Sequence, residues 1–108
     1  STDYPDYAHA VAVAVSSGKA QLGVLVCGSG IGMSIVANKH AGVRASNVES
    51  TEAAKLAREH NNANVLAIGA RLTTWDRAKE ILLAFLSAEF QGGRHQKRVD
   101  KIHDLTDL

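Results

Sequence analysis

Three short apolar runs divide the chain into alternating segments. They cover residues 22–26, 43–48 and 65–68; the first and the last consist mostly of Val, Leu and Ile, and the second begins and ends with Val. Runs of this length and composition are typical of strands buried on both faces of a parallel sheet. We therefore expect three buried strands at these positions.

The segments between the runs repeat their apolar residues at helical spacing. Residues 7–15 also alternate like a strand, but their alanine content and Asp6 as a cap favour a helix that ends at Ser16-Ser17-Gly18, after a loop at residues 1–6. Ser50 or Thr51, and Thr73 or Thr74, are candidate caps of two further helices. After the first helix, we expect one that follows the glycines, includes residues 35–37 and ends near residues 38–40. Three more are expected over residues 52 to about 60, from the Thr73 or Thr74 cap to residue 85 or beyond, and from about residue 94 onward.

Three of these helices have apolar stripes that should face the core. The predicted inward residues are Ala53, Leu56 and Ala57, then Ala78, Ile81, Leu82, Phe85 and Leu86, and last Val99, Ile102 and Leu105.

The element order is α-β-α-β-α-β-α-α, and no repeat or linker interrupts it. Alternating buried strands and amphipathic helices predict an α/β fold, a three-layer, doubly wound (Rossmann-like) parallel sheet. The carboxyl ends of its strands, at Cys27, residues 48–50 and residues 69–71, should meet at one edge, where ligands bind in such sheets. We expect one domain over residues 1–108. Three strands are few for this fold, so a first strand and helix are expected to be missing from this chain.

Composition narrows the function. The 108 residues carry 12 Lys and Arg against 11 Asp and Glu, a formal net charge of +1, and 45% of them are hydrophobic. The absence of an apolar run of about 18 residues argues against a membrane protein, and the low charge argues against a dedicated nucleic-acid binder. A lone cysteine, Cys27, without Cys/His metal spacing or a leader pattern is typical of a cytoplasmic protein.

The first predicted strand runs into a glycine-rich turn, Cys27-Gly28-Ser29-Gly30-Ile31-Gly32. Glycines at alternate positions allow successive backbone N–H groups to converge on an anion. The spacing matches neither the dinucleotide fingerprint nor the P-loop. Facing the amides of a helix start, the Cys27 thiolate would be favoured and could act as a base or nucleophile, but Cys27 could equally be a small buried hydrophobe.

Histidine and arginine side chains supply the other candidates. Arg94 and Arg98 are four residues apart on one helix face and could clamp a phosphate together, or form a solvated basic face. Arg71, at a strand end, is a third anion-binding candidate. His60 could be a simple helix-capping residue. The remaining histidines, which show no ligand spacing and are assigned to the surface or to packing, are His9, His40, His95 and His103.

Four motifs, taken together and in this order, resemble the type B ribose-5-phosphate isomerases. They are Asp3-Tyr4-Pro5-Asp6-Tyr7-Ala8, the turn from Cys27 to Ser34 with Ala37-Asn38-Lys39, Arg58-Glu59-His60-Asn61, and Gly92-Gly93-Arg94-His95 with Arg98-Val99. Members of that family normally begin with a further strand and helix of roughly 40 residues. The resemblance otherwise covers nearly the whole chain.

The resemblance implies interconversion of ribose 5-phosphate and ribulose 5-phosphate through an enediol(ate), without metal or organic cofactor. In this variant Cys27 would be the base, since Met33 stands where other members have a glutamate. Ser29 and the amides of Gly28, Gly30 and Gly32 would stabilise charge on the sugar oxygen. The remaining implied roles are ring opening by His60, substrate binding by Asn61 and Tyr4, and phosphate binding by Arg94, Arg98 and Arg71.

The resemblance further implies a homodimer or tetramer in which two subunits share each site. Two alternatives stay open. One is an isomerase of a six-carbon sugar phosphate, galactose 6-phosphate or allose 6-phosphate, although Arg58 to Asn61 and Gly92 to His95 favour the pentose enzyme. The other is a phosphate-binding or assembly module without catalysis. A flavodoxin-like nucleotide binder is disfavoured, because the sequence has neither a second glycine-rich phosphate loop nor an aromatic pair for a flavin.

Overall fold

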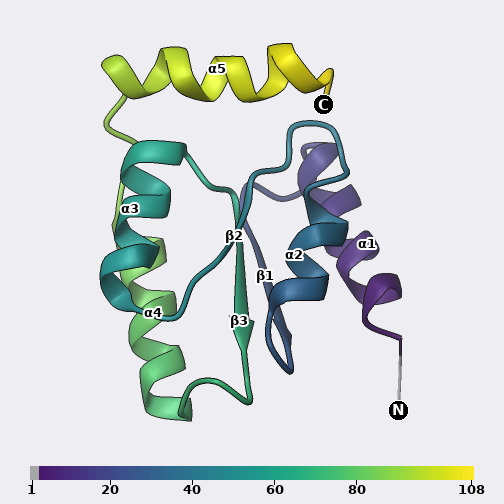
Figure 1. Ribbon diagram of the computed structural model, residues 1–108, viewed down its shortest axis with the longest axis vertical. Coiled ribbons are helices and arrows are strands. Elements are labelled where there is room, and N and C mark those ends of the chain that lie inside the picture. The colour runs from purple at the N-terminus through teal and green to yellow at the C-terminus, as the bar shows by residue number, and fades with distance from the viewer. Residues whose placement is uncertain (1–2) are drawn as a thin grey trace.

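A computed structural model describes residues 3–108 and has the predicted order of elements (Figure 1). The strands are β1 (Gly23–Cys27), β2 (Ala45–Asn47) and β3 (Val65–Gly69). The helices are α1 (Tyr4–Ser16), α2 (Ile31–Ala37), α3 (Thr51–Asn61), α4 (Trp75–Ser87) and α5 (Arg94–Thr106). Among the described residues, no helix is long and apolar enough to cross a membrane.

The three strands form one parallel sheet in the order β1-β3-β2. Cys27 at the end of β1 lies opposite Gly69 at the end of β3, and Asn47 at the end of β2 lies opposite Ala67. The carboxyl ends therefore meet at one edge, as predicted. β2 is shorter than the predicted strand at residues 43–48.

Two layers of helices enclose the sheet (Figure 1). α1 and α2 pack on one face, over a core that includes Leu25, Met33 and Val65. α3 and α4 pack together on the other face, over a core that includes Leu66, Ile81 and Phe85. α5 lies across the end of the sheet at which the strands begin (Figure 1). The three-layer α/β prediction is confirmed.

Burial differs between the strands. All five residues of β3 are buried, as predicted, because β3 is central and helices cover both its faces. The prediction that the first strand is buried on both faces is wrong: Leu25 is buried on the α1 side, but Val24 is 40% and Val26 56% exposed. β1 is at the edge of the sheet, and α4 contacts β3 on the face to which Val24 and Val26 point.

The first helix begins earlier than predicted. Residues 4–6 belong to α1, so the predicted loop at residues 1–6 is wrong there; residues 1 and 2 lie outside the described part. Asp3, not Asp6, occupies the N-cap position, and Pro5 lies in the first turn. Proline is compatible with a first turn because the N–H groups there have no partner within the helix.

Most predicted caps and core residues are confirmed, but some predicted core residues of α3, α4 and α5 are exposed. Ser50 caps α3 and Thr74 caps α4, each accepting a hydrogen bond from a backbone N–H three residues on. Ile81, Phe85 and Val99 are buried as predicted. The predicted inward residues that are exposed instead are Leu56, Leu86, Ile102 and Leu105. On α3, α4 and α5, the buried face is narrower than the apolar stripe in the sequence. On α3, the buried residues are Ala54 and Ala57.

Candidate active site

The thiol of Cys27 lies at the carboxyl edge of the sheet, on the last residue of β1, and is half-buried. The backbone N–H of Gly30 donates a hydrogen bond to its Sγ at 3.2 Å. Gly30 has a φ of +79°, a conformation that glycine adopts without strain, and this turns its N–H back toward the sulfur. This contact holds the sulfur against the glycine turn.

Backbone contacts with the segment after β3 hold this turn. The Ala70 N–H donates to the Cys27 carbonyl at 2.8 Å, and the Arg71 N–H donates to the Gly28 carbonyl at 3.0 Å. Gly69 also packs against the turn: a Cβ at that residue would lie 2.6 Å from the Ser29 carbonyl oxygen. The position of the thiol is thus fixed by main-chain atoms of two neighbouring strand ends.

A hollow of about 730 Å³ opens beside the thiol. Tyr4 reaches it from α1, and a Cβ at Gly32 would lie within 3 Å of the Tyr4 ring. The Arg71 side chain passes over Gly28 at van der Waals distance from where a Cβ would be. The structure brings the following predicted site residues together here: Tyr4, Cys27, Gly28, Ser29, Gly32 and Arg71 lining the hollow, with Gly30 buried behind them.

Ser29 is half-buried, and its hydroxyl accepts a hydrogen bond from the Ile31 N–H at 3.1 Å. This contact orients the hydroxyl within the turn and leaves its proton free to be donated. A hydroxyl beside the thiol can therefore donate to an oxygen that becomes negative during a reaction.

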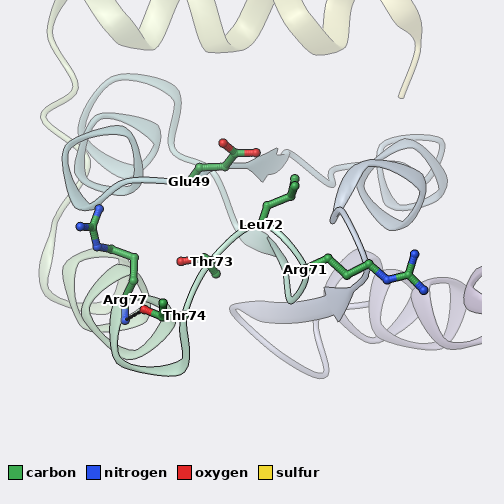
Figure 2. A pocket seen from close by; sticks show the side chains of 6 residues that line it. All are labelled: Glu49, Arg71, Leu72, Thr73, Thr74 and Arg77. Atoms are coloured by element: carbon green, nitrogen blue, oxygen red, sulfur yellow. Dashed lines mark hydrogen bonds between the residues drawn. The ribbon is translucent and has the colours of Figure 1, made fainter.

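A second hollow, of about 480 Å³, lies at the same edge (Figure 2). Glu49, Thr73, Thr74 and Arg77 line it, and Figure 2 shows the Arg71 side chain extending away from these residues. Its charges are mixed, with Glu49 opposite Arg77. The hollow beside Cys27 is therefore the better candidate for a reaction site, although this one is also at the predicted edge.

Sequence reasoning missed Asn47. This residue ends β2, and its Oδ1 is buried without a hydrogen-bond partner and lies 2.6 Å from the place of a Cβ on Gly30. Asn47 thus lies directly behind the glycine turn. Its position at a strand's carboxyl end was the signal that could have found it, but the predicted strand extended to residue 48.

Two histidines stack at the other end of the sheet. His60, in the last turn of α3, and His95, in the first turn of α5, have ring centroids 4.2 Å apart and planes inclined by 13°. His95 is buried, as its assignment to packing allowed, and His60 is half-buried. Partial burial lowers the pKa of His95, and the neighbouring charges of His60, Arg94 and Arg98 lower it further.

The remaining predicted site residues belong to this second group. Arg94 and Arg98 are exposed on α5, one turn apart, and Asn61 is the exposed last residue of α3. α3 ends where the chain turns back toward the start of β3, so these residues lie at the amino end of the sheet (Figure 1). Within one chain, therefore, the structure does not bring His60, Asn61, Arg94 and Arg98 to Cys27.

Among residues 3–108, no three His, Cys, Asp or Glu side chains cluster closely enough to hold a metal ion. The two groups of site residues offer a ligand a thiol, hydroxyls, backbone amides, imidazoles and guanidinium groups. This set suits proton transfer on a substrate that carries an anionic group.

Known proteins similar to this chain identify its family. A family model described as Ribose/Galactose Isomerase matches residues 1–102. The chain is 50% identical over 101 residues to ribose-5-phosphate isomerase B of Escherichia coli, covering 94% of this chain and 68% of that protein. It is 52% identical over 99 residues to D-erythrulose-4-phosphate isomerase of Pectobacterium atrosepticum, covering 92% of this chain and 65% of the relative.

A solved structure gives the same result for the fold. Ribose-5-phosphate isomerase B of Clostridium thermocellum superposes with a TM-score of 0.97 at 48% sequence identity, covering 99% of this chain and 72% of that one. The chain thus spans about two thirds of the length of the curated relatives that it matches.

Proposed function

The chain belongs to the ribose/galactose isomerase family, and from that premise we propose that it interconverts ribose 5-phosphate and ribulose 5-phosphate in the cytoplasm. The observation that carries the proposal is the hydrogen bond from the Gly30 N–H to Cys27 Sγ at the edge of the substrate-sized hollow. It holds the sulfur beside groups that can stabilise an oxyanion. We take residues 1–108 as a single domain of this enzyme.

The chemistry follows from that arrangement. In the open-chain aldose, the Cys27 thiolate removes the proton from C2, and the electron pair moves to the C1 carbonyl oxygen to give an enediolate. Ser29 and the amides of the glycine turn stabilise the developing negative charge. The thiol then returns the proton to C1 as the hydroxyl proton of O2 moves to O1, so that O2 becomes the ketone oxygen and O1 a hydroxyl. Donor and acceptor atoms balance without an external redox partner, so the step uses no cofactor.

The second group of residues serves the rest of the substrate. His60 exchanges a proton with the sugar ring oxygen and so opens the ring, and Asn61 beside it binds a sugar hydroxyl. Arg94 and Arg98 bind the phosphate together, and Arg71 contributes from the thiol side of the site. Tyr4 forms a wall of the hollow next to the glycine turn.

This division of labour calls for two copies of the chain. Cys27 and His60 lie at opposite ends of the sheet, so one chain cannot present both to one sugar. We propose a homodimer, alone or within a tetramer, in which the α5 end of one subunit covers the thiol end of the other. Assembly would then be required for activity.

The decisive test replaces the thiol. Cys27→Ala and Cys27→Ser remove the base and should lower kcat for ribose 5-phosphate by about 1000-fold, within the range that general base catalysis contributes. Turnover is measured by formation of ribulose 5-phosphate. Ser46→Ala, a small change at a half-buried residue in the middle of β2 that leaves the thiol in place, is the matched control and should keep activity.

Full turnover by both Cys27 variants would refute the cysteine base. Binding of ribose 5-phosphate by the wild-type chain without any turnover would instead favour the phosphate-binding or assembly module. Turnover by the wild-type chain, and its loss in the Cys27 variants, therefore separate the two classes of function.

The sugar itself is a separate question, because one relative that is 52% identical is named for a four-carbon sugar phosphate. We propose the pentose phosphate as the preferred substrate, and turnover of four-, five- and six-carbon phosphates on one sample tests this. A higher kcat/KM for D-erythrulose 4-phosphate, or for a six-carbon phosphate, would reassign the substrate within the same chemistry.

A further inference from the structure

His95 has no role in the proposed chemistry, yet its ring stacks on the His60 ring. The two imidazoles are 4.2 Å apart and nearly parallel, and His95 is only 9% exposed. His60 lies in the last turn of its helix and is half-buried, so its ring would otherwise be free to rotate toward solvent. A buried aromatic ring at this distance restricts that rotation.

The backbone places His95 over His60. The Gln91 N–H donates to the Glu59 carbonyl at 3.0 Å, which ties the segment before α5 to the last turn of α3. Gly92 and Gly93 then turn the chain with positive φ, and His95 follows within the first turn of α5. Val99, one turn further on, is buried and holds the same face of α5 against the body of the protein.

The charges around the pair disfavour a proton on His95. Arg94 and Arg98 flank His95 on its own helix, and His60 faces it from α3. Burial and these three neighbours lower the pKa of His95, so His95 is uncharged at neutral pH.

We infer that His95 is a positioning residue, whose ring fixes the plane and direction of the His60 imidazole for proton exchange with the substrate. The role of His60 rests on the proposed function, whereas the stack itself does not. His95 acts through His60 and contacts no reacting atom. Its contribution should therefore appear in kcat, with KM little changed.

Two variants of similar size separate stacking from packing. His95→Phe keeps a flat aromatic ring against His60, while His95→Leu fills the space without one. Gln96→Leu, on the exposed face of the same turn, is the matched control. Proton and carbon NMR of the His60 ring, assigned with His60→Gln, reports the stack directly, because a facing aromatic ring shifts the resonances of its neighbour.

We expect the His60 ring resonances to move in His95→Leu, and to stay close to wild type in His95→Phe and Gln96→Leu. In the isomerase assay, His95→Leu should lower kcat by about 10-fold to 100-fold, the effect of a misplaced catalytic group. His95→Phe should restore most of that loss, and KM should stay within about 2-fold of wild type in both variants.

Unchanged His60 resonances in His95→Leu would overturn the inference, because the stack would then not exist in solution. A rise in KM with unchanged kcat would overturn it as well, since His95 would be a direct substrate contact. If the wild-type chain turns over no sugar phosphate, the proposed function fails, and the NMR comparison still decides whether His95 positions His60.

Discussion

The two ends of the sheet hold their functional groups by different means. At the carboxyl end, main-chain atoms fix Cys27: a strand end, a glycine turn and the Gly69 segment are joined by backbone hydrogen bonds. At the amino end, side chains on helix ends carry the candidates, and Arg94 and Arg98 are exposed. Main-chain contacts within the fold therefore hold the thiol, whereas the two arginines project from the surface of a helix.

This difference predicts how each end responds to substitution. Changes at the carboxyl end disturb the backbone and should affect stability and activity together. Changes at the amino end should alter substrate binding or proton exchange while the fold stays intact, because exposed side chains contribute little to the free energy of unfolding. Three further experiments address that contrast.

The largest effect on stability is expected from Gly69→Ala. The new Cβ would lie 2.6 Å from the Ser29 carbonyl oxygen and 2.7 Å from its carbon, and neither main-chain atom can move aside easily. We expect the free energy of unfolding to fall by about 3 kcal/mol, with loss of turnover. Urea denaturation measures the first effect and the isomerase assay the second.

Gly42→Ala is the control for that experiment. Gly42 has a φ of +74° but nothing within 4 Å of a Cβ, so alanine there costs only the left-handed conformation, about 1 kcal/mol. Equal losses in the two variants would mean that crowding against Ser29 does not fix the turn.

The double variant Arg94→Ala with Arg98→Ala should impair substrate binding and leave the stability of the fold nearly unchanged. Losing two charged hydrogen-bond donors should raise KM for ribose 5-phosphate by roughly 100-fold, while the free energy of unfolding changes by less than about 0.5 kcal/mol. Lys97→Ala with Lys101→Ala removes the same charge from the same helix and should leave KM near wild type. A similar rise in KM in both double variants would indicate a general charge effect instead of a phosphate site.

The smallest effect concerns pH and His95. Because its pKa is lowered from 6.5 in the folded protein, the unfolded chain binds a proton at a higher pH than the folded one. His95 therefore does not reduce the free energy of unfolding above about pH 6.5. As the pH falls below that value toward the folded pKa, the free energy of unfolding decreases. In His95→Phe, the free energy of unfolding should fall less over the same interval.

Urea midpoints for wild type and His95→Phe, measured at about pH 7.5 and about pH 5.5, test this. His9, His40 and His103 are not among the groups that shift His95, and their contributions cancel between the two proteins. Parallel losses would show that protonation of His95 is not opposed by its surroundings in the fold.

Much of the fold could be predicted from apolar spacing. The order of all eight elements, the buried β3 and the caps Ser50 and Thr74 came from local signals, because buried strands and helix starts have distinctive compositions. The exposure of Val24 and Val26 could not, since it depends on which strand is at the edge and how far α4 reaches. Tyr4 was misplaced because a first-turn proline resembles a loop.

For the candidate site as well, short segments could be predicted and contacts between distant segments could not. The strand-to-helix turn after Cys27 identified one half of it, and the family motifs identified His60, Arg94 and Arg98. That these halves lie at opposite ends of the sheet, that Asn47 lies behind Gly30, and that His95 stacks on His60 involve contacts between residues far apart in the chain.

Residue types and their spacing were enough to establish the α/β class, the glycine turn at the end of the first strand and the family of the protein. These features depend on short segments, in which the chemistry of neighbouring residues constrains the backbone strongly. Which groups share a site within one chain depends on the folded arrangement instead, because strand order and helix packing bring distant segments together or keep them apart. The separation of the thiol from the arginines is the clearest example, and it makes a second subunit part of the proposed mechanism.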